Sequence, residues 1–228
     1  MEDKILKYLW KMSLFIEKND LTLSDEKDGL TIMDQWIIEK CIIIRNNYLS
    51  CMNNNNFDNA KKFVDEFLIN DFYTIFKTVL ENKIVDKKDI EVSKNVLLNI
   101  FLEILKMYCF YNTDVVKFIY TNLYLSADKL LLKDNLEEYV TNDNVLYYGE
   151  DIKNIILDVN KFRRDVNISR KKAIDSITLN IKKDDALLFS KSLDDILKLI
   201  NAKNVNVEFG DETYIESISN DKINVKKR

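Results

Sequence analysis

Six basic residues lie close together late in the chain and could contact a polyanion. They are Lys161, Arg163, Arg164, Arg170, Lys171 and Lys172. Residues 151–172 hold seven cations and three aspartates, a local charge of +4, whereas the whole chain carries −4 and its remainder therefore −8. Phosphate contacts normally use Lys or Arg, so a basic edge on an acidic body suits docking of one nucleic-acid feature. The same side chains could instead form a solvated helix end, where cations complement the helix dipole.

Arg45 is a further candidate because it is the one charge amid an apolar stretch that includes Ile44 and Tyr48. Two interpretations stay open for this side chain. It could pair with a buried carboxylate such as Asp71, or it could contact a nucleic-acid base, since guanidinium planes stack on unstacked bases.

The composition disfavours most enzyme classes. The chain has no histidine, which removes Ser/His/Asp and Cys/His nucleophilic arrangements and HExxH zinc sites. Its three glycines, at 29, 149 and 210, cannot build a glycine-rich phosphate loop. Acidic pairs occur at 184–185 and 194–195, but adjacent residues on a helix do not converge on one metal site. We therefore expect no catalytic residue, no cofactor and no metal ligand.

The cysteines favour a reducing, cytoplasmic environment. Cys41, Cys51 and Cys109 are odd in number, follow no CxxC spacing and fall within apolar stretches, which predicts reduced core cysteines. Charges are frequent in residues 1–20, and no apolar run approaches the ~20 residues that span a bilayer, so neither a signal peptide nor a membrane segment is expected.

Apolar periodicity predicts a helical bundle in the first two thirds of the chain. The first helix is predicted over 3–18, and the second from about 35 to 52 with Asp34 as its N-cap. A long helix follows from residue 57, and a central, nearly all-apolar helix covers 90–111. Residues 83–89 read as a charged turn, and Asn112 to Asp114 cap a short fifth helix. Trp10 and Trp36 are expected in the core, because aromatic stripes usually fill bundles.

The pattern changes from about residue 150. We predict an amphipathic helix over 150–164, a strand with alternating apolar residues over 173–181, a helix over 185–201 and a strand over 205–209. Residues 213–218 are a further candidate strand, and the charged tail is expected to fray. The predicted fold is mainly α: a bundle of about five helices over 1–146, then a small α+β appendage over 147–228.

The order of these landmarks resembles the anticodon-binding domain of class Ia aminoacyl-tRNA synthetases. Leu9-Trp10 is similar to the "LWN" of the helix that opens that domain, and Asp34-Gln35-Trp36 to its "D-x-W" helix start. The later matches are Phe57 to Ala60, Asn70 to Tyr73, 96–124, Phe162 to Ile174 and Asn204 to Phe209. The last of these favours the isoleucyl branch, with the valyl and leucyl branches next.

This resemblance covers about residues 3–210. It implies a tRNA partner, preferably of the isoleucine type, that the chain recognises without making or breaking covalent bonds. It adds Lys77 to the candidate tRNA contacts, because Lys77 follows the Phe72-Tyr73 match. The family's catalytic domain needs a histidine-containing motif that this chain lacks, so we expect either a fragment of a larger synthetase, with the catalytic domain in cis, or a free-standing homologue.

An alternative of a different class stays open. A helical protein–protein interaction module, such as a viral cell-death or host-signalling inhibitor, could show the same helix periodicities. Such a module should expose an apolar groove for a partner helix, and it would have no reason to carry the strand–helix–strand segment after residue 173.

Overall fold

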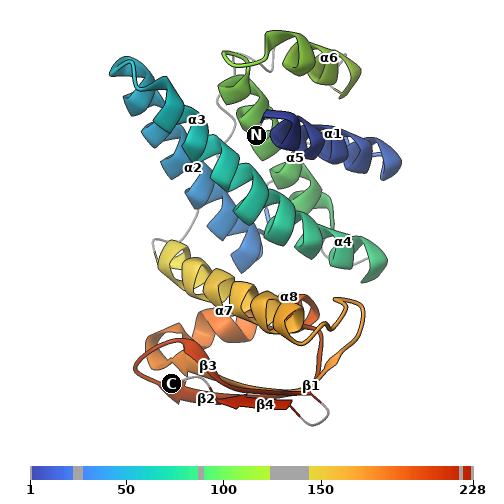
Figure 1. Cartoon of the computed structure of the whole chain (residues 1–228), viewed down its shortest axis with the longest axis vertical. Helices are drawn as coiled ribbons and strands as arrows, with labels where there is room; N and C mark the ends of the chain where they lie inside the picture. The colour runs from blue at the N-terminus through green and yellow to red at the C-terminus, as the bar shows by residue number, and fades with distance from the viewer. Residues whose placement is uncertain (1, 23–27, 87–89, 124–143, 221–222, 227–228) are drawn as a thin grey trace. The chain divides into compact units, whose positions relative to one another are not determined.

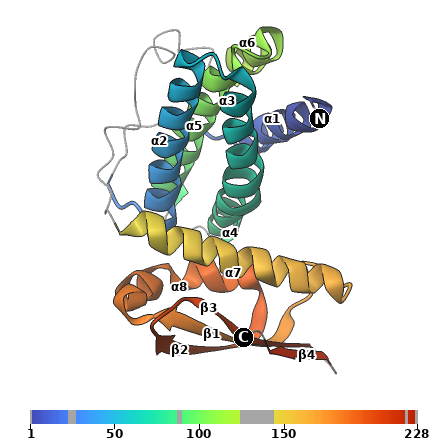
Figure 2. The ribbon, with the colours of Figure 1, turned by 60° about the vertical axis from the view of Figure 1, so that its left-hand side comes forward.

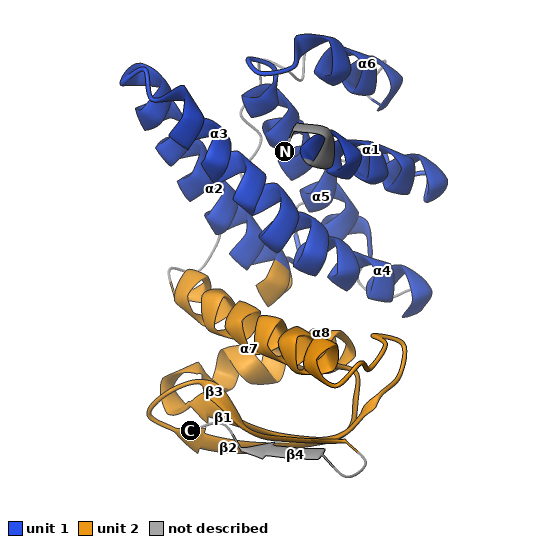
Figure 3. Cartoon of the chain, viewed as in Figure 1, with its two compact units in different colours: residues 1–30, 34–142 blue, residues 31–33, 143–228 orange. Residues whose placement is uncertain are grey.

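The computed structural model describes residues 2–22, 28–86, 90–123, 144–220 and 223–226 of the chain. It is mostly helical, with a helical bundle followed by a small α+β part, so the predicted fold class is confirmed. Residues 1–30 with 34–142 form one compact unit, and residues 31–33 with 143–228 form a second (Figure 3). The sequence-based division was 1–146 and 147–228. Among the described residues, no helix is long and apolar enough to cross a bilayer.

Unit 1 is built from helices only, within the part that the structure describes. Its elements are α1 (Glu2–Lys18), α2 (Ile32–Asn53, apart from its first two residues), α3 (Phe57–Glu66), η1 (Phe67–Phe76), α4 (Lys77–Asp86), α5 (Ile90–Tyr108) and α6 (Thr113–Leu123) (Figure 1). α5 contacts α3, α4 and α6 and is buried along most of its length, as expected of the central helix of a bundle.

The long helix predicted from residue 57 is one helical rod, α3, η1 and α4, with a π-helical middle segment. The backbone amide of Lys77, directly after this segment, donates to the carbonyl of Phe72, five residues earlier. That spacing matches the i to i+5 pattern of a π-helix. The rod continues to Asp86, so the charged turn predicted to begin at Lys83 is wrong in that part, while residues 87–89 lie outside the described residues.

Asp34 is not the N-cap that the sequence predicts. α2 begins at Ile32, so Asp34 lies inside its first turn, fully buried. Its Oδ2 accepts a hydrogen bond of 2.9 Å from Ser93 Oγ in α5 and lies 3.4 Å from Lys83 Nζ in α4, which is also buried. The carboxylate therefore links three helices rather than capping one.

Two further predictions about the core of unit 1 are wrong in part. Trp36 is fully buried as expected, but Trp10 is 47% exposed. The buried face of α1 is formed by Ile5, Leu9, Met12 and Ile16, and Trp10 lies one residue off this stripe. Of the cysteines, all free, Cys41 is buried and Cys109 is exposed, so Cys109 is no core residue.

Unit 2 is a helix-covered sheet. Its elements are α7 (Val145–Asp165), β1 (Ile174–Lys182), a short 3-10 turn, η3 (Lys183–Asp185), α8 (Ala186–Ile200), β2 (Ala202–Gly210), β3 (Tyr214–Asn220) and β4 (Ile223–Lys226). The strand order is β2-β1-β3-β4, with β1 and β2 parallel and β3 antiparallel to β1. α8 is the crossover between the parallel strands, as a βαβ connection requires.

Both long helices of unit 2 cover one face of this sheet (Figures 1 and 2). α7 contacts β3 and α8, and α8 contacts β1 and β2. Ile177, Leu179 and Ile181 of β1 are buried, in agreement with the alternation in the sequence. α7 begins earlier than the predicted residue 150, and the tail expected to fray contains strand β4.

Candidate nucleic-acid interface

The candidate interface is organised around Arg163, near the C-terminal end of α7. The Arg163 side chain is buried, with 3% exposure. Its Nη1 donates to the carbonyls of Ser169 and Lys172, at 2.9 and 2.6 Å. Its Nη2 donates to the carbonyls of Ile200 and Asn201, at 3.0 and 2.9 Å. One guanidinium therefore joins the loop after α7 to the C-terminal end of α8.

This arrangement follows from the donor geometry of arginine. The last carbonyls of a helix have no partner within it, and a guanidinium offers a fork of fixed N–H donors. Desolvation, and to a smaller degree the nearby charge of Arg170, lower the pKa of Arg163 from its ordinary value. These four hydrogen bonds favour a structural role for Arg163, and its contact with tRNA stays a prediction.

The loop between α7 and β1, residues 166–173, is held by further hydrogen bonds. The amide of Ile168 donates to the carbonyl of Arg163 at 2.8 Å, with Asn167 in the left-handed conformation at φ 53°. The amide of Lys172 donates to the carbonyl of Ser169 at 3.0 Å. These bonds fix the backbone that carries the basic side chains.

Asn201 completes this loop and was not among the residues chosen from the sequence. It ends α8 in the left-handed conformation at φ 49°, and its Nδ2 donates to the carbonyl of Arg170 at 2.9 Å. Its own carbonyl accepts from the amide of Ile174, the first residue of β1, at 3.0 Å. An Asn directly after the last apolar residue of a predicted helix is a recognised stop signal, so the sequence held a hint of this position.

Five of the six clustered cations are exposed around this scaffold. We call them the basic edge: Lys161, Arg164, Arg170, Lys171 and Lys172. Lys161 and Arg164 are three residues apart on the last turns of α7, a spacing that places them on neighbouring positions of one helix face. Arg170, Lys171 and Lys172 follow on the loop.

Other cations of unit 2 add less to this surface. Lys153 lies 3.6 Å from Glu150, and Lys203 at the start of β2 lies 2.5 Å from Asp175, so each has an acidic neighbour. An exposed acidic residue, Asp165 at the end of α7, lies next to Arg164 of the basic edge in the sequence. The net positive charge predicted for this part of the chain is therefore displayed mainly by the basic edge.

The two remaining candidates, Arg45 and Lys77, belong to unit 1. Lys77 has a side chain only 13% exposed: its Nζ lies 2.5 Å from Glu81 and over the rings of Phe15 and Tyr73, at 4.8 and 5.3 Å from their centroids. This packing favours a structural role for Lys77. Arg45 is half-buried in α2, and Asp71 is buried in η1. Both interpretations of Arg45 stay predictions.

No protein-family model matches the chain, and neither does any curated protein.

Proposed function

We propose that this chain recognises the anticodon stem-loop of a tRNA, as a non-catalytic domain of an isoleucyl-type aminoacyl-tRNA synthetase or a free-standing homologue of such a domain. The observation that carries the proposal is the basic edge, five exposed cations on backbone that the buried Arg163 fixes from inside. The resemblance described above supports the choice of tRNA among polyanions.

The chemistry of the basic edge suits such a ligand. Arg164 and Arg170 offer planar guanidinium groups, which stack on unstacked bases as well as bind phosphate. Lys161, Lys171 and Lys172 offer point charges for phosphate oxygens. Because the loop backbone is already ordered by hydrogen bonds, binding loses less conformational freedom than it would on a flexible loop.

The acidic remainder of the chain limits where RNA can lie. The net charge of −8 outside residues 151–172 disfavours a polyanion on the rest of the chain, so we expect attraction mainly at the basic edge. A surface of this kind binds one compact feature, such as a loop, more readily than a long duplex. We expect weak binding that falls steeply with salt, since phosphate contacts release counterions.

Filter binding with the full chain tests this function. We expect tRNA(Ile), or tRNA(Val) if the branch is valyl, to bind more tightly than an unrelated tRNA of the same length. An isolated anticodon stem-loop of the preferred tRNA should compete, whereas an acceptor-stem duplex should not. Equal binding of all tRNAs would count against anticodon recognition, because phosphate contacts alone carry no sequence information.

A further inference from the structure

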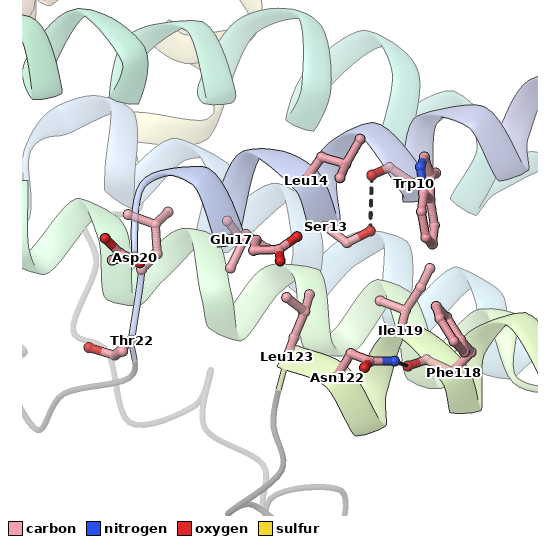
Figure 4. A pocket seen from close by; sticks show the side chains of 12 residues that line it. Trp10, Ser13, Leu14, Glu17, Asp20, Thr22, Phe118, Ile119, Asn122 and Leu123 are labelled. Carbon is pink, nitrogen blue, oxygen red and sulfur yellow. Dashed lines mark hydrogen bonds between the residues drawn. The ribbon is translucent and has the colours of Figure 1, made fainter.

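A groove lies between α1 and α6 in unit 1, and the proposed function does not use it. Its volume is about 480 Å³. Figure 4 shows the two helices side by side, with Trp10 and Phe118 together at one end and Glu17 near Leu123 further along. The groove is thus bounded by two helix faces, as a site for a third helix requires.

One end of the groove is aromatic and apolar. The rings of Trp10 and Phe118 stack with centroids 6.0 Å apart, yet Trp10 is 47% and Phe118 56% exposed. Leu14, one turn further along α1, is 46% exposed. Exposed large side chains gathered in a concave site are the usual anchors of helix-in-groove recognition, because their burial by a partner is favourable.

The other end of the groove is negative for two reasons. Glu17 and Asp20 line it and are exposed, and its described lining contains no Lys or Arg. α1 and α6 also both end towards this side, at Lys18 and Leu123, and the C-terminal end of a helix carries a partial negative charge. Lys18 is the basic residue in the last turn of α1, but it does not line the groove.

Of the uncharged polar side chains that line the groove, Ser13 and Asn122 face their own helices, and Thr22 follows the end of α1. Ser13 Oγ donates to the backbone of α1, at 3.0 Å from the carbonyl of Trp10. Asn122 Nδ2 donates to the carbonyl of Phe118 at 2.7 Å (Figure 4). The carboxylates of Glu17 and Asp20 therefore dominate the polar chemistry that the groove offers to a ligand.

We infer that the α1–α6 groove binds an amphipathic peptide helix that carries Lys or Arg in its N-terminal turn and apolar anchors after them. From Trp10 to Glu17, α1 advances by seven residues, about 10 Å, so the apolar and acidic ends are about two helical turns apart. The partner's N-terminal turn, with its partial positive charge and basic side chains, lies at the acidic end. Its apolar anchors lie against Trp10, Leu14 and Phe118. This inference does not depend on RNA binding.

The intrinsic fluorescence of Trp10 gives a direct readout with the full chain. The chain has two tryptophans, and Trp36 is fully buried, so an added ligand that enters the groove changes mainly the emission of Trp10. The probe is a synthetic helical peptide without Trp or Tyr, with two Lys in its first turn and Leu at i, i+3 and i+7 thereafter. Matched peptides replace the Lys by Glu, or the Leu by Ala.

Two variants with matched controls locate the binding. Phe118→Ala removes an aromatic anchor, and Phe110→Ala removes a phenylalanine of similar exposure, 59%, outside the groove. Glu17→Lys reverses a charge at the acidic end, and Glu66→Lys does so at an exposed position of α3. All four side chains are exposed, and Phe118 and Phe110 each lose one stacked aromatic neighbour, so we expect small shifts of the unfolding midpoint that are matched between variant and control.

We expect the Lys/Leu peptide to shift the Trp10 emission to shorter wavelength and to bind at least tenfold more tightly than either matched peptide. Phe118→Ala and Glu17→Lys should each weaken it about tenfold, and Glu17→Lys should bind the Glu peptide better than the Lys peptide. The controls should bind as the unaltered chain does.

Three results would overturn this inference. The first is no binding of the Lys/Leu peptide up to about 1 mM. The second is equal binding by the chain and its Glu17→Lys variant, which would remove the charge preference. The third is self-association in sedimentation that Phe118→Ala abolishes, which would make a second copy of the chain the occupant.

Discussion

At the scale of single residues, Arg163 and Arg164 are chemically identical neighbours with opposite environments. Arg163 is buried and bound to four carbonyls, whereas Arg164 is exposed on the basic edge. Helical spacing gives part of the reason, because Arg163 continues the buried stripe of Ile156 and Val159. The helical spacing in the sequence therefore indicates that Arg163 faces inward. It does not indicate that the side chain binds carbonyls of the following loop and of a second helix.

The two arginines should therefore respond differently to replacement. Arg163→Met removes four hydrogen bonds, although the carbonyls of Ser169 and Asn201 keep their backbone donors, and should lower the free energy of unfolding by about 2–4 kcal/mol. Arg164→Met should change it by less than about 0.5 kcal/mol. Urea denaturation followed by far-UV circular dichroism measures both. Equal stability of the two variants would contradict the structural role given to Arg163.

Trp10 shows where an argument from spacing fails at this scale. It falls close to the apolar stripe of α1 and was expected in the core, but the stripe that the other helices bury is Ile5, Leu9, Met12 and Ile16. A helical pattern fixes which residues share a face only to within a neighbouring position. Which of two adjacent apolar faces is covered depends on helices distant in sequence.

At the scale of elements, the pair of Asp34 and Lys83 joins α2 to α4, and Ser93 of α5 lies between them. Lys83 Nζ donates to Ser93 Oγ at 2.7 Å, and that oxygen donates to Asp34 at 2.9 Å. The sequence predicts a cap at Asp34 and a turn at Lys83, because each reading used only local neighbours. A contact between residues 34 and 83 could not be read from either segment alone.

A double-mutant cycle tests this network. Lys83→Met leaves the Asp34 carboxylate buried without its cation and should cost about 3–5 kcal/mol of unfolding free energy. Asp34→Leu combined with Lys83→Met should cost clearly less than the two single changes added together, because neither charge is then left buried. Lys62→Met, at the exposed pair of Lys62 and Glu66, serves as the control and should cost under about 0.5 kcal/mol.

Simple additivity of the Asp34 and Lys83 changes would contradict the network. Coupling of the size expected for a buried pair would instead show that α2, α4 and α5 are held together by charge as well as by apolar packing.

The order of elements was predictable to a greater extent than their contacts. Periodicity gave the central helix α5, the alternation of Ile177, Leu179 and Ile181 in β1, and the helix between two strands. The π-helical segment η1 could not be foreseen, because its apolar residues keep nearly the same spacing as an α-helix. The same holds for the candidate site. The exposed cations could be identified from the charge pattern of the sequence, whereas the hydrogen bonds of Arg163 and Asn201 became evident only in the folded structure.

At the scale of the whole molecule, the two candidate binding surfaces belong to different units. Unit 2 carries the basic edge, and unit 1 carries the α1–α6 groove with its acidic end. The sequence set an RNA-binding domain and a peptide-binding bundle against each other as alternatives. The features expected of each, a strand–helix–strand segment and an apolar groove, both occur in the described residues. We therefore propose RNA binding and peptide binding as separate properties of one chain.

The most direct test of RNA binding through the basic edge is the salt dependence of tRNA affinity in two variants of equal net charge. One replaces Arg164, Arg170 and Lys171 by Gln, and the other replaces the exposed Lys7, Lys18 and Lys117 of unit 1 by Gln. For the first, we predict that the slope of log affinity against log salt concentration becomes shallower by about 2–3, since each lost phosphate contact removes about 0.7–0.9. The second should keep the slope of the unaltered chain. An equal change of slope in both variants would contradict the proposal, because binding would then follow net charge rather than the basic edge.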